Sequence, residues 1–191
     1  GSGKTRVLTR RIAYLIGELG IEPDRILAMT FTNKAAGEMR ARVEDLLKRS
    51  CRNMWIGTFH SLCARLLRSE AERVGLQQNF TIYDSTDQMA LMRRVLADEE
   101  LSEKQYPPRQ IRGRISREKN RMMDVTTFAQ RASTFYEQAV ARVYRHYQTR
   151  LRQNNAVDFD DLLLLSVQLL RDHEDIRNKY QGQFDYLLID E

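Results

Sequence analysis

Two short motifs at opposite ends of the sequence constrain the fold more than any other feature. Residues 1–5 read Gly-Ser-Gly-Lys-Thr, and residues 187–191 read Leu-Leu-Ile-Asp-Glu. The first motif is typical of the end of a phosphate-binding loop, in which backbone N–H groups and a lysine hold phosphate oxygens and a hydroxyl holds Mg²⁺. The second is typical of a buried strand that delivers a metal-holding acid and a base that orients water. Together the motifs predict the two halves of an ATP site on an α/β fold.

Apolar runs and helical periodicity alternate around these motifs. Residues 4–17 have the spacing of a helix whose N-terminus would face phosphates. A second helix is predicted to begin with Asn33 as its N-cap, and a third to run through Leu62 and Leu67. The alternation predicts a parallel sheet covered on both faces. Its expected strands are residues 26–31, 54–58, 80–83 and 186–190.

The pattern changes between Asp84 and about Ala156, where we find no strand signal. Asp84 or Ser85 is suited to cap a helix, Pro107-Pro108 restarts the chain, and residues 134–154 repeat the apolar positions of a long helix. This stretch is therefore predicted to be a helical subdomain inserted into the α/β domain.

The charge balance and two strand ends favour a nucleic-acid partner. The net charge is +5, and residues 109–121 hold six basic residues against one acidic residue. Such a run indicates a face that follows phosphates or, alternatively, a solvated helix face. Residues 31–33 and 58–61 lie where predicted strands end, and their polar side chains, N–H groups and aromatic ring suit phosphates and a base. The alternatives there are a capped helix with a core phenylalanine and a structural histidine.

The cysteines and the lengths of the apolar runs indicate the cellular environment in which the chain is expected to fold. Cys51 and Cys63 lack the spacing of a zinc site, so we expect two buried or free thiols in a reducing cytosol. No apolar run approaches the roughly 20 residues that span a bilayer, so no membrane partner is expected.

Taken in order, five segments resemble motifs of superfamily 1 DNA helicases of the UvrD/PcrA/Rep group, and most closely its PcrA-like branch. Residues 1–5 resemble the end of motif I, and residues 187–191 the start of motif II. Between them, the family's motifs Ia and Ib and the stretch after its helical insert are matched by residues 30–43, 55–68 and 157–163.

The resemblance implies a RecA-like P-loop NTPase domain, called 1A, with an inserted all-helical subdomain, called 1B. Domain 1A is expected at residues 1–83 and 157–191, and subdomain 1B at residues 84–156. Domain 1A is expected to be incomplete, because the family's adenine-reading glutamine motif lies upstream and a second RecA-like domain with arginine fingers lies downstream.

The same resemblance implies a role for individual residues. Lys4 and Glu191 are the expected catalytic residues, with Glu191 activating the attacking water. Thr5 and Asp190 would hold Mg²⁺, and Arg6 would lie against the adenine. The expected nucleotide-binding residues are Gly1, Ser2, Gly3, Lys4, Thr5 and Arg6, and the expected DNA-binding residues are Phe31, Thr32, Asn33, Thr58, Phe59, His60 and Phe159.

The implied function is that of a bacterial cytoplasmic motor in DNA repair or replication. It would hydrolyse ATP, move 3′ to 5′ on single-stranded DNA and unwind duplex at a junction of single and double strands. The chain alone is expected to be an inactive fragment, since it would need the second RecA-like domain. Alternatives are a DNA-binding module with an inactive nucleotide site and a RecB-like or AddA-like helicase–nuclease subunit.

Overall fold

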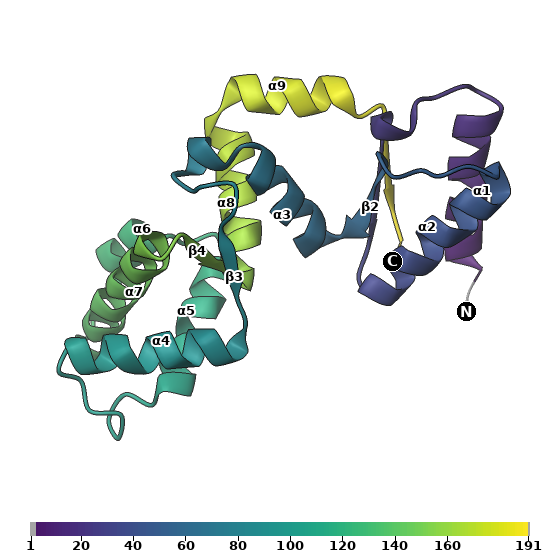
Figure 1. Cartoon of the computed structure of the whole chain (residues 1–191). Helices are drawn as coiled ribbons and strands as arrows, with labels where there is room; N and C mark the ends of the chain where they lie inside the picture. Colours follow the sequence, from purple (N-terminus) through teal and green to yellow (C-terminus); the bar gives the residue numbers. More distant parts are fainter. Residues whose placement is uncertain (1–2, 191) are drawn as a thin grey trace. The chain divides into compact units, whose positions relative to one another are not determined.

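The computed structural model describes residues 3–190, which divide into two compact units. The first unit comprises the described residues of Gly1–Leu66 and Leu169–Glu191, and the second comprises Leu67–Gln168. Figure 1 shows the helices and strands of each. Both units contain parallel strands among helices, which confirms the predicted α/β class. Among the described residues, no helix is long and apolar enough to cross a membrane.

The first unit is built on a parallel three-stranded sheet in the order β2-β1-β5. Met29 of the central strand pairs with Gly57 on one side and Ile189 on the other. The strands are β1 (Ile26–Thr30), β2 (Trp55–Thr58) and β5 (Tyr186–Ile189). The helices that lie wholly in this unit are α1 (Lys4–Gly17), η1 (Pro23–Arg25), α2 (Asn33–Leu47) and α9 (Glu174–Gln183). The unit also contains the start of α3 (Phe59–Ser69) and the end of α8 (Phe159–Asp172).

One face of this sheet is covered by α1 and α2, which lie side by side (Figure 1). Ile12, Leu15 and Ile16 recur at helical spacing, so they share the buried stripe of α1. They pack with Ile26 and Ala28, which alternate along β1 and therefore point to the same face. On the opposite face, Trp55 is covered by Tyr180 and Phe184 at ring-centroid distances of 6.0 and 5.2 Å.

The prediction that both faces are covered is wrong at the edge strand. Leu187 and Ile189 of β5 are 62% and 46% exposed, although Trp55, two strands away on the same face, is buried. The physical reason is that the Tyr180–Phe184 aromatic group covers β2, at the other edge of the sheet.

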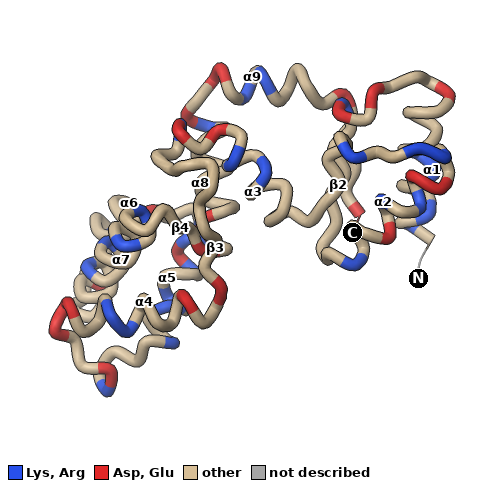
Figure 2. The backbone as a smooth tube through the Cα atoms, viewed as in Figure 1, with Lys and Arg blue, Asp and Glu red and all other residues tan. Residues whose placement is uncertain are grey.

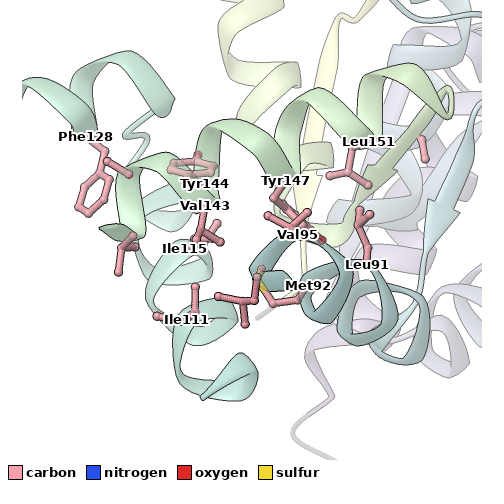
Figure 3. Packing of buried hydrophobic residues seen from close by; sticks show 14 residues of the cluster. Leu91, Met92, Val95, Ile111, Ile115, Phe128, Val143, Tyr144, Tyr147 and Leu151 are labelled. Carbon is pink, nitrogen blue, oxygen red and sulfur yellow. The ribbon is translucent and has the colours of Figure 1, made fainter. Parts of the chain in front are cut away.

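The second unit is mainly helical. Figure 3 shows its core, in which α7 packs Val143, Tyr144 and Tyr147 against apolar side chains of α4 and α5. The elements of this unit are the end of α3, η2 (Ala71–Val74), β3 (Thr81–Tyr83), α4 (Ser85–Asp98), α5 (Pro108–Asn120), α6 (Val125–Arg131), α7 (Phe135–Gln153), β4 (Ala156–Asp158) and the start of α8.

The third predicted strand forms, but it does not join the sheet of the first unit. β3 instead pairs in parallel with β4, a strand that the sequence analysis missed. Asn155, at φ 46°, makes the turn that brings β4 alongside, and its carbonyl accepts a hydrogen bond from the backbone N–H of Thr81. Three residues are too few to show strand periodicity, so this pairing left no clear signal.

The ends of the helices follow capping chemistry. Thr32 rather than Asn33 caps α2, since its hydroxyl accepts a hydrogen bond from the N–H of Ala35 and Asn33 is already helical. Asp84 caps α4 as predicted, and Thr134 caps α7; both form capping boxes. α1 and α5 begin where the sequence placed them, at Lys4 and after Pro107.

Candidate nucleotide and nucleic-acid sites

The two end motifs meet in the first unit. The hydroxyl of Thr5 donates a hydrogen bond to Asp190 Oδ2 at 2.6 Å. Asp190 follows β5, and its backbone N–H is held by the carbonyl of Met29 at 2.9 Å. α1 starts directly after Gly3, whose φ of 74° lies in the left-handed region that glycine adopts without strain. The N-terminus of a 14-residue helix therefore lies beside a carboxylate.

A cavity of about 600 Å³ opens at this point. Gly3, Thr5 and Arg6 line it from the loop and α1, and Asp190 lines it from the end of β5. Free N–H groups at a helix start attract phosphate, and a hydroxyl beside a carboxylate offers the oxygen ligands that Mg²⁺ prefers. The donor set therefore fits a magnesium-bound nucleotide phosphate. The described residues hold no cluster of three or more His, Cys, Asp or Glu side chains that would form a metal site by themselves.

Four other residues were predicted for this site. Gly1, Ser2 and Glu191 lie outside the described residues. Lys4 is the first residue of α1 and is exposed.

The same cavity is also lined by two residues predicted to bind nucleic acid, Phe31 and Thr32. Phe31 follows β1 and is 65% exposed, and its ring lies 5.6 Å from that of Phe59 at an interplanar angle of 48°. An exposed ring supported by another ring is suited to stacking on a base. Two of the predicted DNA-binding residues thus adjoin the predicted nucleotide site.

Thr58 and Thr32 have structural roles at helix starts. The Thr58 hydroxyl accepts a hydrogen bond from the N–H of Ser61 at 3.2 Å, and Thr58 is buried. Thr32 caps α2 in the same manner. Close packing at the start of α3 also explains Gly57, because a Cβ there would lie 2.4 Å from Ser61 Oγ.

The other predicted DNA-binding residues of this unit also lie at helix starts. Asn33 is exposed in the first turn of α2, while Phe59 and His60 are half-buried in the first turn of α3. Their DNA contacts remain predictions.

The last of these residues, Phe159, opens α8 in the second unit and is 47% exposed. The residues around it form a buried charged cluster that the sequence analysis missed. Asp158 and Asp161 are 3% and 2% exposed, and both contact the ammonium group of Lys119, at 2.6 and 2.8 Å.

This cluster corrects the prediction for the basic run at residues 109–121. Lys119 points into the protein and is 1% exposed, so it cannot follow phosphates. Arg114 is half-buried and paired with the buried Glu118 at 2.9 Å. Arg109, Arg117 and Arg121 are exposed, and further basic residues lie on α4 and α7 (Figure 2).

Burial and charge shift the protonation of the cluster. Burial acts to lower the pKa of Lys119, but the adjacent Asp161 and Asp158 carboxylates outweigh it and raise that pKa above its usual range. Burial raises the pKa of Asp161 to about 6, against the opposing effect of Lys119. Burial also raises the pKa of the nearby Tyr147 hydroxyl. The ammonium group thus stays charged at neutral pH.

Comparison with known proteins agrees with the motifs. A family model described as "UvrD/REP helicase N-terminal domain" matches residues 1–191. Proteins named "ATP-dependent DNA helicase PcrA" are 48% identical in Leuconostoc citreum and 44% identical in Bacillus subtilis (strain 168). Each match covers 100% of this chain and 26% of the relative, so the chain spans about a quarter of the length of these relatives.

Proposed function

The chain belongs to the UvrD/REP helicase family, and from this we propose that it is the ATP-binding part of a longer ATP-dependent DNA helicase. The observation that carries the proposal is the Thr5–Asp190 hydrogen bond, which joins the two halves of the predicted ATP site in a cavity that Phe31 also lines. The names of the relatives, which match over the whole chain, support the same function.

We propose the family's domain division for this chain. Residues 1–83 and 157–191 are assigned to a RecA-like domain 1A, and residues 84–156 to the inserted subdomain 1B. The parallel β2-β1-β5 sheet supports the first assignment, and helices α4 to α7 support the second. The compact units divide inside α3 and α8, so their limits differ from the proposed domain limits.

At the nucleotide site, the residues of this chain would bind and orient ATP. Backbone N–H groups of Gly1, Ser2 and Gly3 would surround the phosphates, and Lys4 would neutralise the β and γ oxygens. Arg6, which lines the cavity, would pack against the adenine.

Mg²⁺, when bound, neutralises charge on the β and γ phosphates. Thr5 and Asp190 would hold the ion, since their oxygens already lie within hydrogen-bond distance of each other. Glu191 would orient the attacking water, which requires a base beside the γ-phosphate.

Coupling to DNA would begin at the same cavity. Phe31 and Thr32 line its wall, so closure around a nucleotide would act directly on a base-stacking ring. We propose that ATP binds between this domain and a second RecA-like domain. Closure of the two would then move Phe31 and Phe159 relative to contacts of the other domain, giving 3′ to 5′ stepping on single-stranded DNA.

The test is single-turnover unwinding by the full-length protein that carries this chain. Duplexes with a 3′ tail are expected to be unwound and those with a 5′ tail to remain paired, with ATP hydrolysis stimulated by single-stranded DNA. Lys4→Ala is expected to abolish this hydrolysis. DNA binding without ATP hydrolysis by the unmodified protein would instead identify a DNA-binding module and refute the proposal.

A further inference from the structure

The ammonium group of Lys119 is fully saturated by hydrogen bonds inside the second unit. Its side chain is 0% exposed, and its nitrogen donates to Asp158 Oδ2 at 2.6 Å and to Gln148 Oε1 at 3.0 Å. Asp161 Oδ1 lies at 2.8 Å as the third acceptor. A lysine ammonium has three donors, so each has a partner here. The rings of Tyr147 and Tyr144 also face this nitrogen, at 5.3 and 5.8 Å.

The two carboxylates that hold Lys119 also hold the first turn of α8. Asp158 Oδ1 accepts a hydrogen bond from the N–H of Asp161 at 2.9 Å, and Asp161 Oδ2 accepts one from the N–H of Asp158 at 3.2 Å. This is the reciprocal arrangement of a capping box. The remaining oxygens face Lys119 and also accept from Tyr147 and Gln148, at 3.2 and 3.0 Å. All four carboxylate oxygens are therefore engaged.

Phe159 is fixed between these two buried carboxylates. Its neighbour Asp160 is held separately, by a hydrogen bond from Asn120 of α5 at 3.1 Å. The backbone around Phe159 is thus tied to α5 by Lys119 and Asn120, and to α7 by Tyr147 and Gln148. With the residues around it held inward, Phe159 remains 47% exposed.

The energetics favour a geometric role for this cluster over a purely stabilising one. Buried ion pairs often contribute no more stability than apolar side chains of similar volume, because removing charges from water is costly. Here two carboxylates share one ammonium group, which adds to that cost. What apolar side chains would not supply is a fixed direction for each carboxylate, and hence for the turn that carries Phe159.

We propose that Lys119 is a positioning residue that fixes the Phe159 ring for stacking on single-stranded DNA. This inference rests on the proposed function, since it assigns Phe159 to DNA binding. Lys119 acts through Asp158 and Asp161 and does not touch DNA itself, because it is buried.

The test is DNA-stimulated ATP hydrolysis by the full-length protein, with a poly-dT oligonucleotide as the probe. Lys119→Met keeps the length of the side chain and removes its charge. We expect it to raise the half-saturating DNA concentration roughly 10-fold, the scale of one lost base-stacking contact. The maximal rate and the KM for ATP are expected to stay within about twofold, because a misplaced ring weakens DNA binding without changing the nucleotide residues.

A double-mutant cycle separates positioning from simple stability. If Lys119 acts through Phe159, the Lys119→Met/Phe159→Ala variant is expected to bind DNA no more weakly than Phe159→Ala alone. If the two substitutions instead raise the half-saturating DNA concentration by the product of their separate factors, the proposal is overturned. So would a lower maximal rate with an unchanged half-saturating DNA concentration, which is the result of a smaller folded fraction.

A milder variant covers the case in which Lys119→Met does not fold. Tyr147→Phe removes only the hydroxyl that bonds Asp158, and it is expected to raise the half-saturating DNA concentration about 2- to 3-fold, in line with one modest hydrogen bond. No change in this variant counts against the proposal. An unmodified protein that DNA does not stimulate would refute the proposed function, and this inference with it. A stimulated protein whose variants act independently of Phe159 would refute the inference alone.

Discussion

The hydroxyl of Thr5 donates a 2.6 Å hydrogen bond to the carboxylate of Asp190, a residue 185 positions further along the chain. One group stands in the first turn of a helix and the other at the end of a strand, so the contact exists only when α1 and β5 are both placed on β1. This pair is therefore a local measure of whether the proposed nucleotide site is assembled.

Removing the Thr5 hydroxyl is expected to weaken magnesium binding. In the full-length protein, Thr5→Ala should raise the Mg²⁺ concentration for half-maximal ATP hydrolysis by about 10-fold or more, the cost typical of a disturbed metal site. Thr5→Ser keeps the hydroxyl and should stay near the unmodified protein. An alanine variant with an unchanged magnesium titration would show that Thr5 does not hold the ion.

Phe31 is expected to contribute stacking energy to DNA binding. Phe31→Ala should weaken binding of a fluorescent single-stranded oligonucleotide by roughly 5- to 150-fold, because one base–aromatic stack is worth about 1–3 kcal/mol. Phe31→Trp retains a ring and serves as the control. Thermal unfolding should change little, since Phe31 is 65% exposed. Equal affinity of the alanine and tryptophan variants would exclude stacking.

Asp161 is expected to make stability depend on pH. Burial raises its pKa from 3.8 to about 6, so its contribution is fully present below about pH 4 and is lost as the pH rises through 6. Urea unfolding measures the free energy of unfolding of the unmodified chain and of Asp161→Asn. Between pH 4 and pH 7, the value for the unmodified chain should fall by about 2–3 kcal/mol relative to that of the variant. If the stability difference between the unmodified chain and Asp161→Asn stays constant over this pH range, the raised pKa of Asp161 is contradicted.

Asp185 provides a control, because its effect on stability is expected to change with pH in the opposite direction to that of Asp161. Arg25 donates a hydrogen bond to Asp185 at 2.7 Å, and this hydrogen bond lowers the pKa of the carboxyl below its ordinary value. The contribution of Asp185 is present above that ordinary value and is lost as the pH falls. The stability difference between the chain and Asp185→Asn should therefore shrink toward acid pH, opposite to the trend for Asp161.

The 191-residue chain by itself is expected to show negligible ATP hydrolysis. Under the proposed function, hydrolysis needs a positively charged group from a second RecA-like domain, and such groups contribute about 10³- to 10⁵-fold in related phosphoryl-transfer enzymes. The measurement is phosphate release from the purified chain with and without single-stranded DNA. Turnover that DNA stimulates would contradict this prediction.

Much of the first unit could be predicted from local pattern. The limits of α1 and the positions of β1, β2 and β5 follow from apolar spacing and from motifs that are continuous in sequence. The predicted cap of α2, Asn33, is one residue late, because Thr32 and Asn33 are adjacent and both suit an N-cap.

The charged cluster could not be predicted in the same way. Lys119 lies in a run of basic residues that is typical of a solvated helix face, and the nearer in sequence of the two acids that it contacts, Asp158, is 39 positions away. Asp158 and Asp161 read as ordinary acids at a helix start. Only the packing of α5 and α7 against the start of α8 turns these surface-like residues into a buried network.

The parallel pairing of β3 with β4 has a mechanical consequence. Thr81 lies opposite Ala156 and Tyr83 opposite Asp158, so the chain enters this ladder at one end and leaves it at the other. Tension between the flanking segments would load the ladder in shear, and its hydrogen bonds would have to break together. Helices α4 to α7 would stay outside the path of the force until then. The three-residue strands would therefore keep such a load off the helices between them until the ladder breaks.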